Sequence, residues 1–477
     1  MGTTKVFVAL CVCLMAGCCL GQLSVKRRLS YSAQQCRINR ITSNEPSRRI
    51  ECEGGLIEVW DENDEQFQCS GIDARRITIQ PNSLVLPSFH PFPRLVYIQQ
   101  GEGILGVSYP GCPETYQSTS RRQESGRRGE REWQSGGQSD LHQKVHRFRA
   151  GDILAIPPGA VHWSYNDGNE EIISIAVNDL NNHANQLDQN FRASFLAGGL
   201  GGRSGLRERR GEEQQFQQFQ NIFSTFDSEL MAEAFNVPED LIKRMQQSQD
   251  RSLIVRAEKG QMRILSPRSL EEEEEDEERR RSKYMGLLDD VNGLEETVCT
   301  MRLRHNLDNR READVFSRRG GRLNIVNQHK LPILRELDMS VEKGHMFPNT
   351  IYSPHWAMNS HSAVYVTQGD AQLQIVGNNG ETIMDDTVKQ GEMFVIPQFF
   401  TSICKAGNNG FEYVSFKTTS SPMKSPLVGY TSVFRAMPLQ VISNSFRISP
   451  SQAQELKFGR QHQTFFLSPQ AKSGRSS

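Results

Sequence analysis

The chain has 477 residues, enough for two sizeable hydrophobic cores, although its 36% hydrophobic content is low for a compact protein. Its 55 basic and 56 acidic residues leave a formal net charge of −1, which argues against a nucleic-acid-binding protein. Beyond the N-terminal region, no apolar stretch approaches the roughly 20 residues of a membrane-spanning helix, so we expect no membrane partner either.

The first 21 residues have the pattern of a secretory signal peptide. Lys5 precedes an apolar run over residues 6–20 that is too short to span a membrane, and Gly21 is a suitable small residue before the cleavage point. The secretory route is oxidising and permits disulfides. Sequence alone cannot choose among the pairings of the six cysteines that follow the signal.

Two segments of the chain occur twice. Residues 97–102 recur as 365–370, and residues 151–157 recur as 391–397. In the first pair an apolar, β-branched run ends at a glycine followed by an acid, which predicts a strand leading into a tight turn. The repeats indicate a duplicated β-domain.

The first copy is longer because it carries two polar insertions, near residues 114–143 and 198–215. Both are rich in Gly, Arg, Gln and Ser and have little to bury, so we expect loops. A third repeated region, in which residues 222–223 match 433–434, is predicted to be helical in both copies.

Further helices are predicted after each β-domain. Residues 227–235 place several apolar side chains near one face, and Pro238 opens a second helix. In the second copy, Ser449 as cap and Pro450 as first residue form a good helix start. These apolar faces could cover their own β-domain or a neighbouring subunit. We favour a subunit interface, because helices added to a complete β-domain need another surface on which to bury those faces.

The composition changes sharply over an acidic linker at residues 266–291. Its eight consecutive acids, at 271–278, repel one another and predict a solvated, mobile segment. Asn292 and Gly293 follow, and this pair is either an ordinary turn or an exposed protease site. Residues 22–292 carry a net charge of −7 and residues 293–477 one of +5, so an acidic piece meets a basic piece here.

Several stretches of the chain resemble the legumin-type 11S seed storage globulins of the cupin superfamily. The most specific is the junction Asn-Gly-Leu-Glu-Glu-Thr at 292–297, with Cys299 two residues later. Residues 54–60, 109–113 and 354–359 match the same family. The resemblance implies a mainly β fold of two domains, a bicupin with two jelly-roll β-barrels and a helical extension on each. The N-terminal cupin would lie in the acidic chain and the C-terminal cupin in the basic chain.

The resemblance also implies how the protein matures. An asparaginyl endopeptidase would cut after Asn292, and the products would be stored in the protein storage vacuole of the seed. The helices would clasp neighbouring subunits to form a trimer. We expect the uncut precursor to be a trimer and the cut protein a hexamer, because acidic linkers crowded on one face would repel a second trimer.

Four cysteines are paired by the family pattern. Cys36 would pair with Cys69 inside the acidic chain, and Cys112 with Cys299 across the cut. Two further cysteines lie outside these bridges, and a free buried thiol and a third bridge both remain open for them; they are Cys52 and Cys404.

The metal motifs of active cupins are incomplete in this chain. Such cupins bind a metal through two His and one Glu of a first motif and one His of a second. In the first half the two His positions hold Ser88 and His90, the Glu position holds Arg94, and the second motif is complete with His162.

In the second half only His355 fits a ligand position, because Ser362 replaces the Glu and Ser402 the later His. A catalytic metal needs about three protein ligands. We therefore expect His90, His162 and His355 to be vestiges, with no metal and no other cofactor.

Other catalytic motifs are also missing from the sequence, which has no Gly-x-Ser-x-Gly elbow, P-loop or dinucleotide fingerprint. The predicted function is a non-enzymatic nutrient reservoir whose partners are copies of itself and the processing protease. Two alternatives remain. A metal-dependent cupin enzyme would need the ligands that this chain lacks, and a non-catalytic cupin would bind a small ligand in a barrel mouth.

Overall fold

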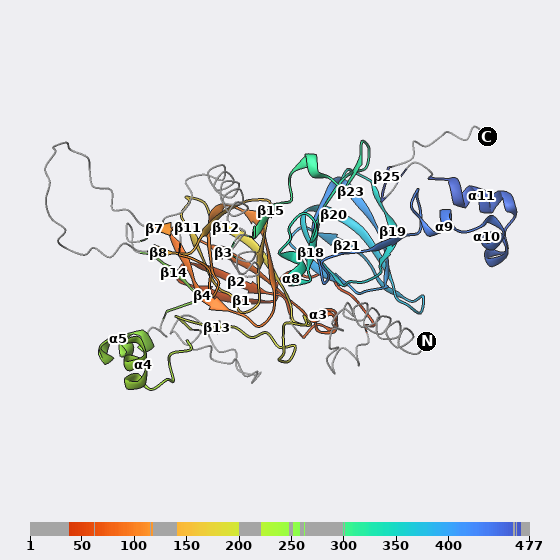
Figure 1. The fold of residues 1–477 in the computed structure, drawn as a ribbon. Coiled ribbons are helices and arrows are strands. Elements are labelled where there is room, and N and C mark those ends of the chain that lie inside the picture. The colour runs from red at the N-terminus through yellow and green to blue at the C-terminus, as the bar shows by residue number, and fades with distance from the viewer. Residues whose placement is uncertain are drawn as a thin grey trace, which may run out of the picture.

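The computed structural model describes residues 38–61, 63–114, 116–117, 141–199, 221–247, 251–257, 262, 299, 301–460, 463 and 465–468. Two β-barrels lie side by side, and a group of helices stands beyond each barrel, at opposite ends of the molecule (Figure 1). The predicted mainly β fold of two barrels with helical extensions is confirmed. No helix in the described part of the chain is long and apolar enough to cross a membrane.

The first barrel consists of two antiparallel sheets. One has the strand order β1-β2-β3-β12-β5-β10-β15, and the other has the order β13-β4-β11-β6-β9, with β14 paired to β4. The strands of the first sheet are β1 (Arg48–Cys52), β2 (Gly55–Val59), β3 (Ile72–Ile79), β12 (Ile172–Asp179), β5 (Arg94–Gln100), β10 (Asp152–Ile156) and β15 (Arg304–Asn306). Those of the second are β13 (Ser194–Phe195), β4 (Ser83–Phe89), β11 (Val161–Asn166), β6 (Glu102–Ser108), β9 (Val145–Arg149) and β14 (Ile254–Arg256).

The second barrel is one continuous sheet of ten strands. The path β16-β17-β18-β23-β19-β24 is extended by β20, β21, β22 and β25. These strands are β16 (Val315–Ser317), β17 (Gly321–Val326), β18 (Ser340–Met346), β19 (Ile351–Ala357), β20 (Ser362–Val376), β21 (Thr382–Lys389), β22 (Met393–Ile396), β23 (Thr401–Lys417), β24 (Lys424–Pro426) and β25 (Phe466–Leu467). Short helices α3 (Glu65–Ser70), η2 (Arg310–Glu312) and α8 (Leu334–Leu337) connect strands of the two barrels.

The repeated glycine has different effects in the two copies. Gly101 has a φ of 83° and separates β5 from β6, as the sequence predicted. Gly369 also has a positive φ, of 76°, but β20 continues through it. The register of β20 against β23 shifts at this point, so a β-bulge absorbs the left-handed residue without ending the strand. The predicted tight turn is therefore wrong for the second copy.

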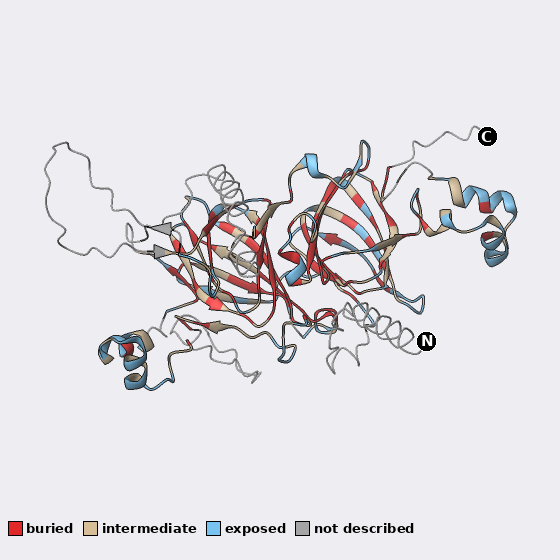
Figure 2. Ribbon diagram, viewed as in Figure 1, coloured by how far each residue is buried: buried red, intermediate tan, exposed pale blue. Residues whose placement is uncertain are grey.

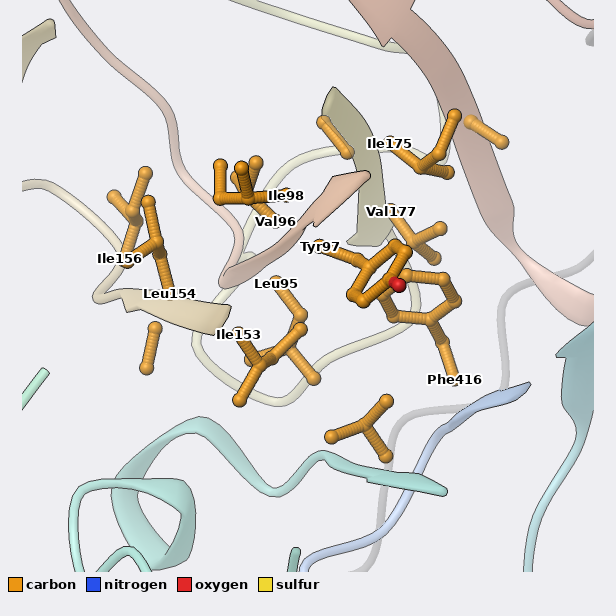
Figure 3. Packing of buried hydrophobic residues seen from close by; sticks show 14 of the residues in the cluster. Leu95, Val96, Tyr97, Ile98, Ile153, Leu154, Ile156, Ile175, Val177 and Phe416 are labelled. Atoms are coloured by element: carbon orange, nitrogen blue, oxygen red, sulfur yellow. The ribbon is translucent and has the colours of Figure 1, made fainter. Parts of the chain in front are cut away.

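The two barrels share one hydrophobic core. Strands β5 and β10 are buried along nearly all of their length, because one face lines their own barrel and the other packs toward the second barrel. Tyr97 and Phe416 come from different barrels and belong to the same cluster (Figure 3). Tyr365, the repeat partner of Tyr97, is buried in the same cluster and stacks edge-on against Trp60.

Each barrel is completed by a segment from the other side of the acidic linker. Strand β15 lies beyond the acidic linker in sequence, yet it pairs with β10 of the first barrel. Conversely, Asn44 near the start of the described chain exchanges two backbone hydrogen bonds with Met393 on β22, and Ile41 is buried in the core of the second barrel. The structural border between the barrels therefore does not coincide with residue 293.

All but one of the predicted helices form where expected. The first group contains α4 (Ser228–Phe235), capped by Asp227, and α5 (Glu239–Gln246). The second contains α9 (Val433–Ala436), α10 (Leu439–Phe446) and α11 (Pro450–Phe458), the last with a capping box at Ser449. The equivalent positions Asn236 and Arg447 both end a helix with a φ of 53°. In the first copy, however, residues 222–223 lie in a turn, so the helix predicted there is wrong.

Both helical groups stand away from the barrels, and most of their residues are exposed (Figures 1 and 2). Leu230 on α4 is 62% exposed and Leu456 on α11 is 56% exposed. The interpretation that these helices cover their own barrel is therefore wrong within this subunit. Their apolar faces are free to contact another one.

The predicted polar insertions lie mostly outside the described residues. The ends of the first insertion are described and form a short hairpin of β7 (Tyr116–Gln117) and β8 (Leu141–His142). The side chain of Gln143 bonds to the backbone of Tyr109 and Cys112, which fixes the base of this hairpin to the first barrel.

Candidate functional site

Arg94 lies at the centre of a polar cluster inside the first barrel. Its guanidinium nitrogens lie 2.9 Å from Nε2 of His90 and 3.4 Å from Nε2 of His162. Its Nε donates to the Asn178 side-chain oxygen at 2.7 Å. The Nδ1 atom of His162 lies 3.3 Å from the carbonyl oxygen of Ala160, which suits a tautomer with Nδ1 protonated and Nε2 free to accept from Arg94. All four side chains of the cluster are buried.

A second layer of charges surrounds this cluster. Asn178 donates to Asp73 at 2.6 Å, and the same carboxylate accepts two hydrogen bonds from Arg75. The Arg75 guanidinium carbon lies 3.3 Å from the centre of the Phe191 ring, a cation–π contact. The carboxylate of Asp73 and the guanidinium groups of Arg75 and Arg94 give this cluster an excess of one positive charge.

The surroundings keep both histidines neutral. Burial and then the charge of Arg94 lower the pKa of His162 to about 3, and the same two causes hold the pKa of His90 well below its usual range. Burial and the nearby charge of Arg75 lower the pKa of Arg94 to about 9, so Arg94 remains charged at neutral pH. The two imidazoles therefore act as acceptors for one buried cation.

These residues do not fit a metal ion. The sequence motifs placed His90 and His162 at ligand positions, and the structure brings their rings to a centroid distance of 5.0 Å. The lone pairs that would bind a metal accept from Arg94 instead, and that side chain occupies the position of the motif's Glu. Among the described residues, no group of three or more His, Cys, Asp or Glu is arranged to hold a metal.

This geometry predicts that a single substitution restores metal binding. Arg94→Glu would place a carboxylate beside His90 and His162 and complete a two-His, one-carboxylate ligand set. We expect this variant to retain about one Zn²⁺ per chain after dialysis, as measured by elemental analysis. Arg94→Gln removes the charge without adding a strong ligand and is the matched control. The unchanged protein should hold clearly less than one metal per chain, and a stoichiometric metal lost on His162→Ala would contradict this interpretation.

The second barrel contains a different cluster of charges. Glu342 on β18 forms an ion pair with Lys424 on β24, and its carboxylate lies 3.6 Å from the ammonium of Lys417 on β23. Tyr413 donates to Glu342 at 3.1 Å, and Lys424 donates to the hydroxyl of Tyr352 at 2.6 Å. One carboxylate again faces two cations.

His355 lies at the edge of this second cluster. Its Nδ1 lies 2.8 Å from the carbonyl oxygen of Ser353, and its ring stacks on Tyr352 with centroids 4.5 Å apart. Burial and then the charge of Lys424 lower its pKa to about 3, so it is neutral. The structure places it beside lysines, tyrosines and the single carboxylate of Glu342, and the described residues around it include no group of three or more His, Cys, Asp or Glu that could hold a metal.

A pocket opens beside these charged groups. Its polar lining includes Glu342, Lys417, Lys424 and His355, and its other walls are mainly apolar strand residues of the same barrel. Burial would raise the pKa of Glu342, but Lys417 and Lys424 outweigh this and lower it to about 2. Burial lowers the pKa of Lys424 to about 8 although Glu342 opposes this change.

The sequence motifs did not identify Glu342, Lys417 or Lys424. Lys417 ends a strand in which alternate residues face the interior, and this alternation could have marked it as an inward-facing cation. Lys424 carries no such signal, because β24 has only three residues and reaches the barrel by pairing with β19.

The structure joins Cys112 to Cys299, which are 187 residues apart in the chain. Cys69 is also in a disulfide. Cys36, Asn292 and Gly293 lie outside the described residues. Among the described residues, Cys52 and Cys404 are free thiols. Burial raises the pKa of both; Cys52 is half-buried, and Cys404 is buried with a pKa of about 12.

Comparisons with known proteins place this architecture among the cupins. The Cupin family matches residues 41–197 and 305–454, one match for each barrel. The 11S globulin seed storage protein 2 of Sesamum indicum is 54% identical over 471 residues, which cover 98% of each chain.

Solved structures of 11S globulins have the same architecture as this chain. The recombinant pro-11S globulin of pumpkin is 37% identical with a TM-score of 0.75, and the match covers 91% of this chain and 100% of that chain. The 11S globulin of Wrightia tinctoria, whose structure reveals an auxin binding site, is 35% identical with a TM-score of 0.76, covering 91% of this chain and 97% of that one.

Proposed function

Because this chain belongs to the 11S seed storage globulins of the cupin family, we propose that it is made as a precursor, cut after Asn292 and kept as a disulfide-linked pair of chains that assembles into a hexamer. Seed storage is the function of the family. The acidic chain would span residues 22–292 and the basic chain residues 293–477.

The disulfide between Cys112 and Cys299 is the observation that carries this proposal. Cys112 precedes the Asn292–Gly293 pair and Cys299 follows it. A cut at this pair would therefore leave both products covalently joined. A second bridge, between Cys69 and Cys36, would lie wholly within the acidic chain.

The helical groups support a ring-shaped trimer. They stand at opposite ends of the subunit, and each exposes apolar side chains such as Phe235 on α4 and Phe446 on α10. A contact between one end of a subunit and the opposite end of the next is heterologous, and such contacts close into a ring when the rotation permits. Burying both apolar groups in this way would form the trimer.

Cleavage would then allow two trimers to meet face to face. Before the cut, the eight acids at 271–278 are tethered close to the start of the basic chain, and like-charged linkers on one face repel a second trimer. After the cut, the linker is free to swing away from that face. The exposed faces would bury apolar surface in a closed two-fold arrangement.

We predict that Asn292→Gln stays trimeric after treatment with an asparaginyl endopeptidase, whereas the unchanged protein becomes a hexamer. Sedimentation velocity before and after protease distinguishes the two sizes. Asn379→Gln is the matched control, because Asn379 also precedes a glycine in an exposed turn; it should assemble like the unchanged protein. A hexamer formed by uncut protein at moderate salt would refute the switch and leave the storage function intact.

We further propose that the protein travels through the secretory pathway to the protein storage vacuole and catalyses no reaction. The signal-peptide pattern of residues 1–21 supports the route. Arg94 in the position of a motif carboxylate argues against a metal-dependent cupin enzyme.

Ligand binding is a second candidate function, favoured by the pocket inside the second barrel. Pockets with apolar walls and a few converging polar groups are the usual form of small-molecule sites. The auxin binding site of the Wrightia tinctoria globulin supports a ligand-binding role beside storage in this family.

A further inference from the structure

The pocket of the second barrel encloses more positive than negative charge. The side chains of Lys417 and Lys424 are 3% and 8% exposed, and that of Glu342 is 3% exposed. Both ammonium groups share this one carboxylate, while the tyrosines and the histidine around it are neutral. Buried charges are normally paired, so one cation in this pocket is left without a counter-ion of its own.

The first barrel shows how an excess cation can be satisfied without an anion. There, Arg94 donates to three uncharged acceptors supplied by His90, His162 and Asn178. In the second barrel, the ammonium of Lys417 has weaker partners. They are the hydroxyls of Ser362 at 3.1 Å and Ser415 at 3.4 Å, besides Glu342 at 3.6 Å. Its environment is therefore suited to a further, negatively charged acceptor.

The remaining walls of the pocket are suited to an apolar group. They include Leu373, Phe394, Ile396 and Phe400.

We propose that the second barrel binds a small organic monocarboxylate, with its carboxylate at Lys417 and Lys424 and its apolar body against the aromatic and aliphatic walls. A single negative charge matches the single unpaired cation. An inorganic anion would leave the apolar walls without a partner, and a neutral molecule would leave the cation without one. This inference rests on the ligand-binding candidate and is independent of the storage function.

Calorimetric titration of the purified protein with benzoate, benzyl alcohol and phosphate tests the proposal. Benzyl alcohol matches the shape of benzoate without its charge, and phosphate has charge without an apolar body. We expect benzoate to bind roughly 10- to 100-fold more tightly than either, as a charge-assisted hydrogen bond in a buried site would produce.

Lys424→Met should weaken benzoate binding at least tenfold. This variant leaves Glu342 and Lys417 as a pair of opposite charges, so the barrel is expected to fold. Lys417→Met leaves Glu342 and Lys424 as such a pair and provides a second test. Lys405→Met is the matched control, because Lys405 is exposed on the same strand as Lys417 and does not line the pocket. This control should bind benzoate like the unchanged protein.

Two results would overturn the proposal in different ways. If benzyl alcohol bound as tightly as benzoate and Lys424→Met had no effect, the ligand-binding function would stand but the monocarboxylate class would be wrong. If none of the three probes bound, both the class and the ligand-binding candidate would be wrong.

Discussion

Glu342→Gln should lower the free energy of unfolding by about 3–5 kcal/mol, the usual cost of removing one partner from a buried ion pair. Glu342 is the carboxylate that both Lys417 and Lys424 face, and it also accepts a hydrogen bond from Tyr413. A neutral amide would leave two ammonium groups buried together without a counter-ion. Chemical denaturation at neutral pH measures the loss.

The difference between Glu342→Gln and the unchanged protein should depend on pH. The pKa of Glu342 is lowered in the folded protein from its ordinary value of 4.5 to about 2. A carboxylate with a depressed folded-state pKa contributes stability that is fully present above its unfolded value and is lost as the pH falls toward the folded one. The two proteins should therefore differ most above about pH 4.5 and converge as the pH approaches 2.

Two further variants isolate the cause of this effect. Glu381→Gln makes the same change at an exposed position of the same barrel and should alter stability by no more than about 0.5 kcal/mol. Adding Lys424→Met to Glu342→Gln removes one of the two repelling cations and should recover part of the loss. If the double variant were less stable than the sum of the two single changes, repulsion between the lysines would not be the cause.

Cys299→Ser should convert the cut protein from one covalent species into two. The partner of Cys299 is Cys112, which lies on the other side of the proposed cut at Asn292. Denaturing gels without reductant should show a single species for the unchanged protein and separate acidic and basic chains for the variant. Cys52→Ser is the matched control, since Cys52 is a free thiol, and it should run as one species.

In native solution the same Cys299→Ser variant should remain assembled. Strand β15 from the basic chain pairs with β10 of the acidic chain, while Asn44 of the acidic chain pairs with Met393 of the basic chain. These exchanged segments hold the two products together without the disulfide. Gel filtration that found separated chains under native conditions would show that the exchange is too weak to replace the covalent bond.

The sequence indicated the first barrel's cluster better than the second's. Motif spacing alone identified His90, His162 and Arg94, because the family motif fixes which strand positions face the interior. It could not show that the Arg94 side chain donates to both rings, since this depends on how β5 and β11 are placed in space. Lys424 was not predicted, because its position depends on pairing between β24 and β19.

The fold, too, could be predicted from the sequence only in part. Repeated segments predicted two β-domains, and Ser449 as a cap predicted the start of α11. The pairing of β15 with the first barrel was not predicted, since three residues carry too little pattern to assign them to a sheet. The bulge at Gly369 was missed because glycine at positive φ fits a turn and a bulge equally well.

The guanidinium of Arg94 also bears on what a seed must supply to make this protein. In a metal-binding cupin the central cation is recruited from the cell, and folding is coupled to its availability. Here the cation of the first barrel is encoded in the polypeptide and synthesised with it. Folding of the first barrel should therefore not depend on a supply of trace metal, and a chelating agent should leave its stability unchanged.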